Sequence, residues 1–179
     1  MKRISLLGLV LVLFTASNAV NAWGQKVNVD FDKEANFAAY KTYAWTKGTP
    51  AQNPLMDQRI TDGIDKQLAA KGLQKVDASA SPDLAVLYHA AVGAETQLNT
   101  MNSGGWGYRW GGGMGTSTTT VEKIPVGQLT VDIGDAKTRK LLWMGNASDT
   151  LSDKPEKNEN KINSALEKMF KKFPPPVKK

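Results

Sequence analysis

Five stretches of the chain alternate between apolar and polar residues, or are largely apolar throughout, as β-strands do when one or both faces are buried. The stretch 84–92 is largely apolar on both faces, which predicts a strand in the middle of a sheet. Trp143 is the bulkiest residue expected to be buried, in a stretch that should form an antiparallel hairpin with the one before it. The predicted strands are residues 27–31, 40–45, 84–92, 129–133 and 141–147.

Two longer segments repeat apolar residues at the spacing of an α-helix. The first should begin at Asn53 and Pro54, because asparagine caps helices and proline fits the first helical position, and should end at Gly72. The second should run from Pro155 towards the prolines that start at Pro174. The apolar stripes are Met56, Ile60, Ile64 and Leu68 in the first helix, and Ile162, Leu166, Met169, Phe170 and Phe173 at the second.

The order of these elements predicts an α+β fold, because strands are followed by a helix, more strands and a final helix. We expect an antiparallel β-sheet with two amphipathic helices packed on one face. The 179-residue chain has room for one such domain, which we place at residues 23–173. Residues 174–179 are expected to form a disordered tail.

Residues 102–115 interrupt the pattern with glycines and aromatic residues. A threonine-rich strand at residues 116–121 follows, and Pro125 breaks the pattern again. The sequence therefore predicts a long hairpin whose flexible tip is residues 102–115.

Residues 1–22 have the features of a cleavable signal peptide. Lys2 and Arg3 precede an apolar run over residues 4–14, and small residues surround Ala22. The run is too short for a stable membrane anchor, so we expect cleavage after Ala22. The alternative is an N-terminal anchor that is never cut.

The composition of the chain argues against attachment of the exported protein to a membrane. The chain has no cysteine, so it lacks the residue that carries the lipid of a bacterial lipoprotein. No other stretch is long and apolar enough to cross a membrane. The formal net charge of +6, part of it in the leader, favours acidic partners only weakly. We expect a soluble exported protein.

Few residues offer catalytic or metal-binding chemistry. His89 is the only histidine, and its place in a predicted central strand favours a hydrogen-bonded residue over a catalytic base. Zinc prefers nitrogen and sulfur ligands, so with one histidine and no cysteine we predict neither a metal nor a cofactor. Asp30 and Asp32 project from one strand face and could bind a cation or do acid–base work. Their spacing matches no calcium loop, which favours solvated carboxylates.

The glycine-rich tip carries the strongest candidate for a binding site. Trp106, Tyr108 and Trp110 alternate, so in an extended backbone they would face one way, with Arg109 opposite. Aromatic residues of this kind are typical anchors for sugar rings and protein partners. The alternative is that they fold back on their own domain. The glycines lack the pattern of a phosphate-binding loop, and one arginine is not a nucleic-acid-binding array.

The last predicted helix is rich in lysine. Such a face could make peripheral contact with anionic lipid, although the solvated face of an amphipathic helix is the more common role. The lysines are Lys157, Lys161, Lys168, Lys171 and Lys172.

Five blocks of sequence, in order, are similar to the DUF4136 family of bacterial envelope proteins. The resemblance implies the α+β fold and a Gram-negative, periplasmic setting, and it supplies no catalytic residues. Many members resemble lipoproteins, but this chain lacks the cysteine, so membrane anchoring is not carried over. The blocks are DFDKEANFAAYKTYAW (30–45), RITDGIDKQLAAKGLQKV (59–76), DLAVLYH (83–89), GQLTVDIGDAKTRKLLWMGNA (127–147) and FKKFPP (170–175).

We therefore expect a non-enzymatic periplasmic protein that binds an envelope protein or glycan through the loop around Trp106 and Trp110. One alternative is a hydrolase-type enzyme that uses Asp30, Asp32 or His89. Another is a carrier of a small lipophilic ligand held between the helices and the sheet. The sequence does not specify the partner or the oligomeric state.

Overall fold

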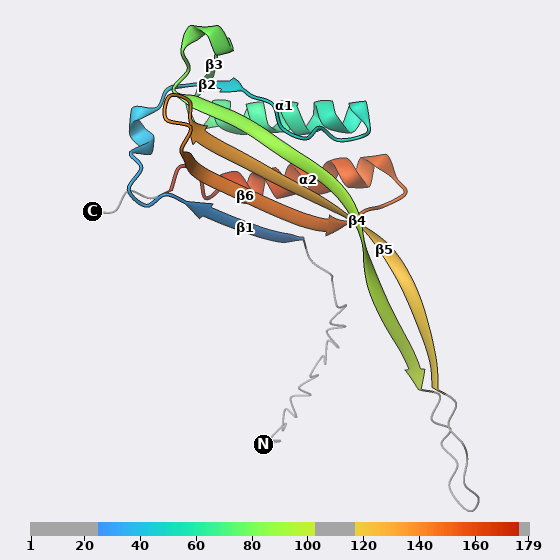
Figure 1. Ribbon diagram of the computed structural model, residues 1–179. Helices are drawn as coiled ribbons and strands as arrows, with labels where there is room; N and C mark the ends of the chain where they lie inside the picture. The colour runs from blue at the N-terminus through green and yellow to red at the C-terminus, as the bar shows by residue number, and fades with distance from the viewer. Residues whose placement is uncertain (1–24, 103–116, 176–179) are drawn as a thin grey trace, which may run out of the picture.

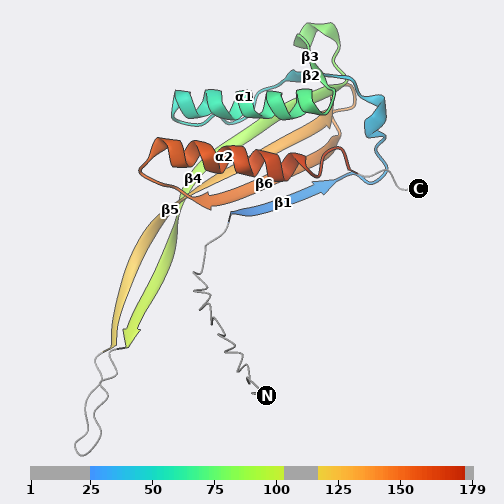
Figure 2. The ribbon, with the colours of Figure 1, turned by 180° about the vertical axis from the view of Figure 1, so that it is seen from behind.

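The computed structural model describes residues 25–102 and 117–175, in which two helices lie side by side on one face of a six-stranded sheet (Figures 1 and 2). This is the α+β class that the sequence predicts. The elements are β1 (Lys26–Phe31), η1 (Phe37–Ala39), β2 (Thr42–Trp45), α1 (Pro54–Ala70), β3 (Gln74–Lys75), η2 (Ala78–Ala80), β4 (Leu84–Asn102), β5 (Ser117–Asp135), β6 (Leu141–Thr150) and α2 (Pro155–Phe170).

The sheet is mixed, with the strand order β1-β6-β5-β4-β2-β3. The expected antiparallel pairing holds for β1, β6, β5 and β4, but it is wrong for β2, which runs parallel to both β3 and β4. Helix α1 explains the difference. It lies between β2 and β4 in the chain, and a helical crossover returns the chain to the starting end of the sheet, so the next strand runs in the same direction.

Strands β4 and β5 form a ribbon of 19 residues each, which extends well beyond the end of β6 (Figure 1). The expected break at Pro125 is wrong, because β5 continues through this residue. The Pro125 carbonyl accepts a hydrogen bond from Leu151 N at 2.8 Å, so this residue's backbone groups face away from β4. A proline at such a position removes no hydrogen bond from the β4–β5 ladder.

The boundaries of α1 follow from its capping residues. The Asn53 side chain accepts hydrogen bonds from the backbone N–H groups of Leu55 and Met56, at 3.0 and 3.2 Å. Gly72 has a φ of 82°, the left-handed conformation that ends helices and that glycine adopts without strain. Ile60, Ile64 and Leu68 are buried, as the apolar stripe predicts.

One end of the helix–sheet interface is packed by aromatic rings, which we call the aromatic cluster: Phe37, Trp143, Phe170 and Phe173. The Trp143 ring centroid lies 5.2 Å from that of Phe170 and 5.4 Å from that of Phe173. The Phe37 and Phe173 centroids are 5.7 Å apart, in an edge-on arrangement. Trp143 is fully buried, so these rings anchor α2 to the sheet.

Candidate functional site

The other end of the helix–sheet interface contains a pocket of about 350 Å³. Both helices, the segment before α1, and strands β4, β5 and β6 contribute to its walls. A volume of this size falls at the lower end of the range of small-molecule sites. The apolar part of the lining is Ala51, Met56, Ile60, Ala90, Val92, Leu129, Ala147, Leu151, Ile162 and Ala165.

Small side chains create this space, so we call it the alanine pocket. On the helix-facing side of the sheet, Ile133 lies opposite Trp143, and Leu129 lies opposite Ala147 two rows further along. On β4, the buried Tyr88 is followed on the same face by Ala90. Side-chain volume therefore falls towards the end where the β4–β5 ribbon leaves the body, while the helices continue above it.

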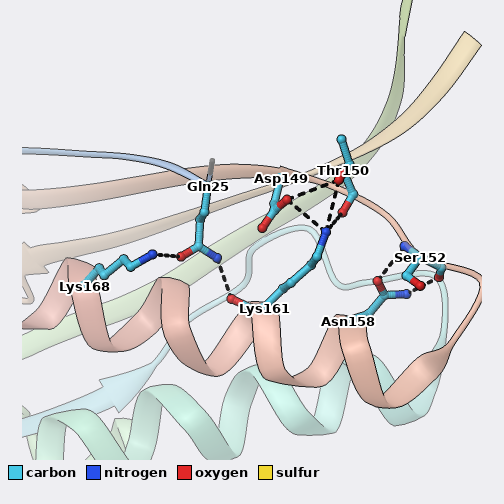
Figure 3. A network of polar contacts seen from close by, with 7 residues as sticks. All are labelled: Gln25, Asp149, Thr150, Ser152, Asn158, Lys161 and Lys168. Carbon is cyan, nitrogen blue, oxygen red and sulfur yellow. Dashed lines mark hydrogen bonds and ion pairs between the residues drawn. The ribbon is translucent and has the colours of Figure 1, made fainter. Parts of the chain in front are cut away.

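Polar groups lie along the side of the pocket where α2 meets the end of β6 (Figure 3). The Lys161 ammonium donates to Asp149 Oδ1 at 3.0 Å, to the Thr150 carbonyl at 2.7 Å and to Thr150 Oγ1 at 3.1 Å. The Asn158 side chain donates to the Ser152 carbonyl and accepts from Ser152 N. These bonds connect α2 to the end of β6 and to the segment that follows it, beside the alanine pocket.

Gln25 completes this network at the start of the described chain. Its side-chain nitrogen donates to the Lys161 carbonyl at 2.7 Å, and its oxygen accepts from Lys168 Nζ at 2.9 Å (Figure 3). Two of the lysines considered as a lipid-binding face thus have intramolecular partners.

Helix α1 is held over the sheet by two carboxylates. Asp57 accepts hydrogen bonds from the Tyr88 hydroxyl and from Ala51 N, next to the pocket. Burial and the Asp57 carboxylate raise the pKa of Tyr88 to about 12, so this phenol stays protonated and donates. About two turns further along the helix, Asp65 Oδ1 accepts from the Tyr43 hydroxyl and from Trp45 Nε1, both at 2.8 Å.

The aspartates predicted as a possible catalytic pair have separate local roles. Asp30 accepts a hydrogen bond from the following backbone N–H at 2.9 Å. Asp32 forms an ion pair with Lys140, with Oδ2 and Nζ 2.6 Å apart. The hydrogen bond from Lys140, together with one from Glu34 N, lowers the pKa of Asp32. The two Asp32 oxygens therefore accept from the Glu34 backbone N–H in the following turn and from Lys140, the residue before β6.

His89 lies on the face of the sheet opposite the helices. Its Nδ1 shares a hydrogen bond of 2.8 Å with Thr49 Oγ1. Strands β5 and β6 separate it from β1, so the structure does not bring His89 together with Asp30 or Asp32. The carboxylate that interacts electrostatically with His89 is Asp132, on the neighbouring strand β5. Burial raises its pKa and the His89 charge opposes this shift, and its Oδ1 has no partner in the described chain.

The aromatic loop proposed from the sequence, Trp106, Tyr108, Arg109 and Trp110, lies outside the described residues. Within the described ranges there is no group of three or more histidine, cysteine, aspartate or glutamate residues placed to hold a metal ion. The alanine pocket was not located by sequence analysis. The one signal for it is the run of small residues on the inner faces of the strands.

These observations define the structural class of the protein. It is an α+β protein with a mixed sheet, two helices on one face and an apolar pocket between the layers. The family model for the domain of unknown function DUF4136 matches residues 27–175, so the chain belongs to this family. No curated protein sequence matches the chain. None of the helices in the described part is long and apolar enough to span a membrane.

Comparison with solved structures finds similarity at low sequence identity. A PDZ domain protein from Parabacteroides distasonis is 17% identical and aligns with a TM-score of 0.56 over 85% of this chain. The aligned part is 36% of that protein, so this chain spans about a third of its length. The PelC dodecamer from Paraburkholderia phytofirmans is 13% identical, with a TM-score of 0.45, over 82% of this chain and 98% of that one. At 17% identity, the match to the PDZ domain protein shows a shared fold and says nothing about function.

Proposed function

We propose that the protein is a non-enzymatic binding protein of the Gram-negative periplasm that holds a small lipophilic ligand in the alanine pocket. The observation that carries this proposal is the pocket itself, which has apolar walls and a polar side. A narrow aliphatic chain would contact Ala90, Ile60 and Ile162, and its polar end would lie towards Lys161 and Gln25. Burial of apolar surface would drive binding.

The leader supports the periplasmic part of the proposal. Residues 1–22 combine a basic start, a short apolar run and small residues before Ala22, and the chain contains no cysteine for lipid attachment. N-terminal sequencing of the protein recovered from the periplasmic fraction is expected to begin at Trp23. Recovery of intact Met1 would contradict the cleavage.

Filling the pocket tests the ligand proposal. Ala90→Leu adds volume on the pocket wall, whereas Ala70→Leu adds the same atoms at an exposed position at the end of α1. Dodecanol and dodecanoate serve as probes, and calorimetry measures their dissociation constants. We expect Ala90→Leu to weaken binding about tenfold or more and Ala70→Leu to leave it unchanged, because added side-chain volume displaces ligand methylenes.

Two results would contradict a lipophilic-ligand site. One is that neither probe binds the wild-type protein, and native mass spectrometry finds no co-purified lipid. The other is that Ala70→Leu weakens binding as much as Ala90→Leu. Tighter binding of dodecanoate than of dodecanol would place the ligand's polar end beside Lys161.

A second candidate function concerns the segment between β4 and β5. The ribbon formed by these strands projects beyond β6 (Figure 1), and Trp106, Tyr108 and Trp110 lie between the two strands in the sequence, which supports contact with an envelope protein or glycan. We expect Trp106→Ala/Trp110→Ala and a variant shortened within 104–113 to lose a partner that in-cell crosslinking captures with the wild type. Identical capture by all three proteins would remove this site.

A further inference from the structure

Beyond the body of the protein, β4 and β5 pair only with each other in the described chain. The last residue pair between β5 and β6 is Val126 with Thr150, and the last contact on the outer side of β4 is the bridge between Thr49 and His89. The edge of β4 is therefore open from Val92 outwards. The edge of β5 opens only beyond Pro125, whose carbonyl still accepts from Leu151 N, and the ladder between the two strands continues to the pair of Asn102 and Ser117. Two-stranded ribbons alone are marginally stable in water.

The hydrogen bonds at the base of the ribbon fix which backbone groups face outwards. Ala90 N donates to the Thr49 carbonyl, and Thr49 N donates to the Tyr88 carbonyl, both at 2.9 Å. Since backbone groups alternate in direction along a strand, the outward-facing N–H and C=O groups of β4 belong to every second residue from Ala90. On the projecting part these residues are Val92, Ala94, Thr96, Leu98 and Thr100.

The outer edges of β4 and β5 differ in how strongly their residues discourage pairing with a further strand. The outer edge of β5 contains Pro125, which has no N–H, and Lys123, and both features discourage pairing with another strand. The outer edge of β4 from Val92 to Thr100 has no proline, and Glu95 is its one charged residue. The β4 edge is thus the one that accepts a further strand.

Apolar side chains accompany the open β4 edge. Leu98 and Val121 lie opposite each other in the ladder and are 65% and 61% exposed. Val92, on the same strand face as Leu98, is 66% exposed. Exposed apolar side chains beside an unpaired strand edge are typical of surfaces that are covered in an assembly.

We propose that the β4 edge from Val92 to Thr100 pairs antiparallel with the same edge of a second copy of this chain. The product is a four-stranded sheet in the order β5-β4-β4-β5, with a two-fold axis near Gln97. A two-fold contact requires a self-complementary edge, and this segment meets the requirement. With the axis near Gln97, Glu95 lies opposite an uncharged residue, so no like charges face each other.

The pairing also places the apolar side chains together. Residues whose outward groups bond to each other share one sheet face, so Leu98 and Val121 of both copies lie on the same face of the four-stranded sheet. Val92 belongs both to the lining of the alanine pocket and to the start of the paired edge. The tests below measure association and crosslinking of the ribbon, so their outcome does not depend on the ligand proposed for the pocket.

Proline substitution distinguishes the two edges. Thr96→Pro removes an outward N–H from β4, and Lys123→Pro, directly opposite it in the ladder, removes one from β5, and neither removes a bond of the β4–β5 ladder. Sedimentation equilibrium of the intact protein should show a dimer. We expect Thr96→Pro to raise its dissociation constant about tenfold or more and Lys123→Pro to leave it within about twofold.

Cysteine crosslinking tests the register, because the chain has no cysteine of its own. Gln97→Cys would lie opposite its counterpart across the two-fold axis, where antiparallel strands bring Cα atoms within disulfide range. We expect mild oxidation to give a covalent dimer of Gln97→Cys. Glu122→Cys, its neighbour across the ladder on β5, is the matched control and should stay monomeric.

Three outcomes would overturn the proposal. The first is a wild-type protein that stays monomeric up to millimolar concentration. The second is a dimer weakened equally by both proline variants. The third is a dimer that survives both, with equal crosslinking of the two cysteine variants. A monomer whose β4 edge instead crosslinks to another periplasmic protein would assign the edge to that partner and exclude the second copy.

Discussion

The aromatic cluster and the alanine pocket are opposite ends of one helix–sheet interface, and they differ in how the same two layers are filled. At the cluster, the rings of Trp143, Phe170 and Phe173 lie within 6 Å of one another. At the pocket, Ala90, Ala147 and Ala165 leave about 350 Å³ unfilled by the protein. The cluster stabilises the fold through close packing. The pocket is less well packed and leaves a space of the size that small ligands occupy.

The largest expected effect is on the cluster. Trp143→Ala should lower the free energy of unfolding by about 3–5 kcal/mol, because it removes a fully buried ring that two phenylalanines contact. Urea denaturation measures this change. Trp143→Phe is the control: it keeps a ring and removes an indole N–H that has no partner in the described chain, so it should cost much less. Equal losses in both variants would argue against packing as the cause.

A pair of glycines tests the comparison directly. A Cβ added at Gly145 would lie 2.5 Å from the Trp143 ring and 2.8 Å from Met169 Sδ, so Gly145→Ala should cost about 1–3 kcal/mol through overpacking. A Cβ added at Gly127 would meet Leu151 Cδ2 at 2.8 Å, the movable end of a side chain beside the pocket. Gly127→Ala should cost less than about 1 kcal/mol. Thermal unfolding of the two variants measures the difference. A larger loss of stability in Gly127→Ala than in Gly145→Ala would contradict tighter packing at the cluster than at the pocket.

The polar side of the pocket should show a smaller effect. Lys161→Met keeps the length of the side chain but leaves Asp149 and the Thr150 oxygens without their donor, and should cost about 1–2 kcal/mol. Lys157→Met, on the same helix at an exposed position, should be close to neutral. Chemical denaturation of both variants makes the comparison. If both cost the same, Lys161 does not hold α2 over the pocket.

The smallest effect should lie outside both regions, where Asp83 connects β2 to β4. Its Oδ2 accepts from Lys41 N, Thr42 N and Thr42 Oγ1 at 2.9–3.0 Å, and these hydrogen bonds lower the pKa of this carboxyl. The unfolded chain therefore binds a proton more readily. The stability that Asp83 contributes is present above its ordinary pKa of 3.8 and is lost as the pH falls through the lower folded value.

Asp83→Asn should accordingly reduce the loss of stability on acidification below pH 4, while its effect at neutral pH stays small. Unfolding midpoints measured from neutral pH to pH 3 test this. Parallel pH profiles of Asp83→Asn and wild type would exclude Asp83 as a source of acid sensitivity.

Local signals in the sequence predict much of the fold. Asn53 and Gly72 mark the ends of α1 because capping depends on a few adjacent residues. The alternation around Trp143 predicts β5 and β6 because each strand has one buried face. The direction of β2 is not predictable in this way, since four residues carry no record of the crossover that sets their orientation.

The sequence predicts the long hairpin around residues 102–115, but the full length of β4 and the pocket are not predicted, for different reasons. Beyond Val92, β4 alternates little because both of its faces are exposed, so a period-two pattern has no cause there. The alanine pocket consists of volume that side chains do not fill, and this depends on which elements lie above Ala90 and Ala147. In the sequence, these small apolar residues look the same as ordinary core residues, because the pocket depends on how the helices lie over the sheet.

The position of β1 sets a condition on the order in which the molecule can be completed. Among the described strands β1 comes first in the sequence, yet its partner is β6, which comes last, and Gln25 just before β1 bonds to α2. A ribosome releases the N-terminus first. Val27, Val29 and Phe31 therefore stay unpaired until β6 has been made. Until then the nascent chain exposes an unpaired strand with three apolar residues, which is the kind of segment that holding chaperones bind.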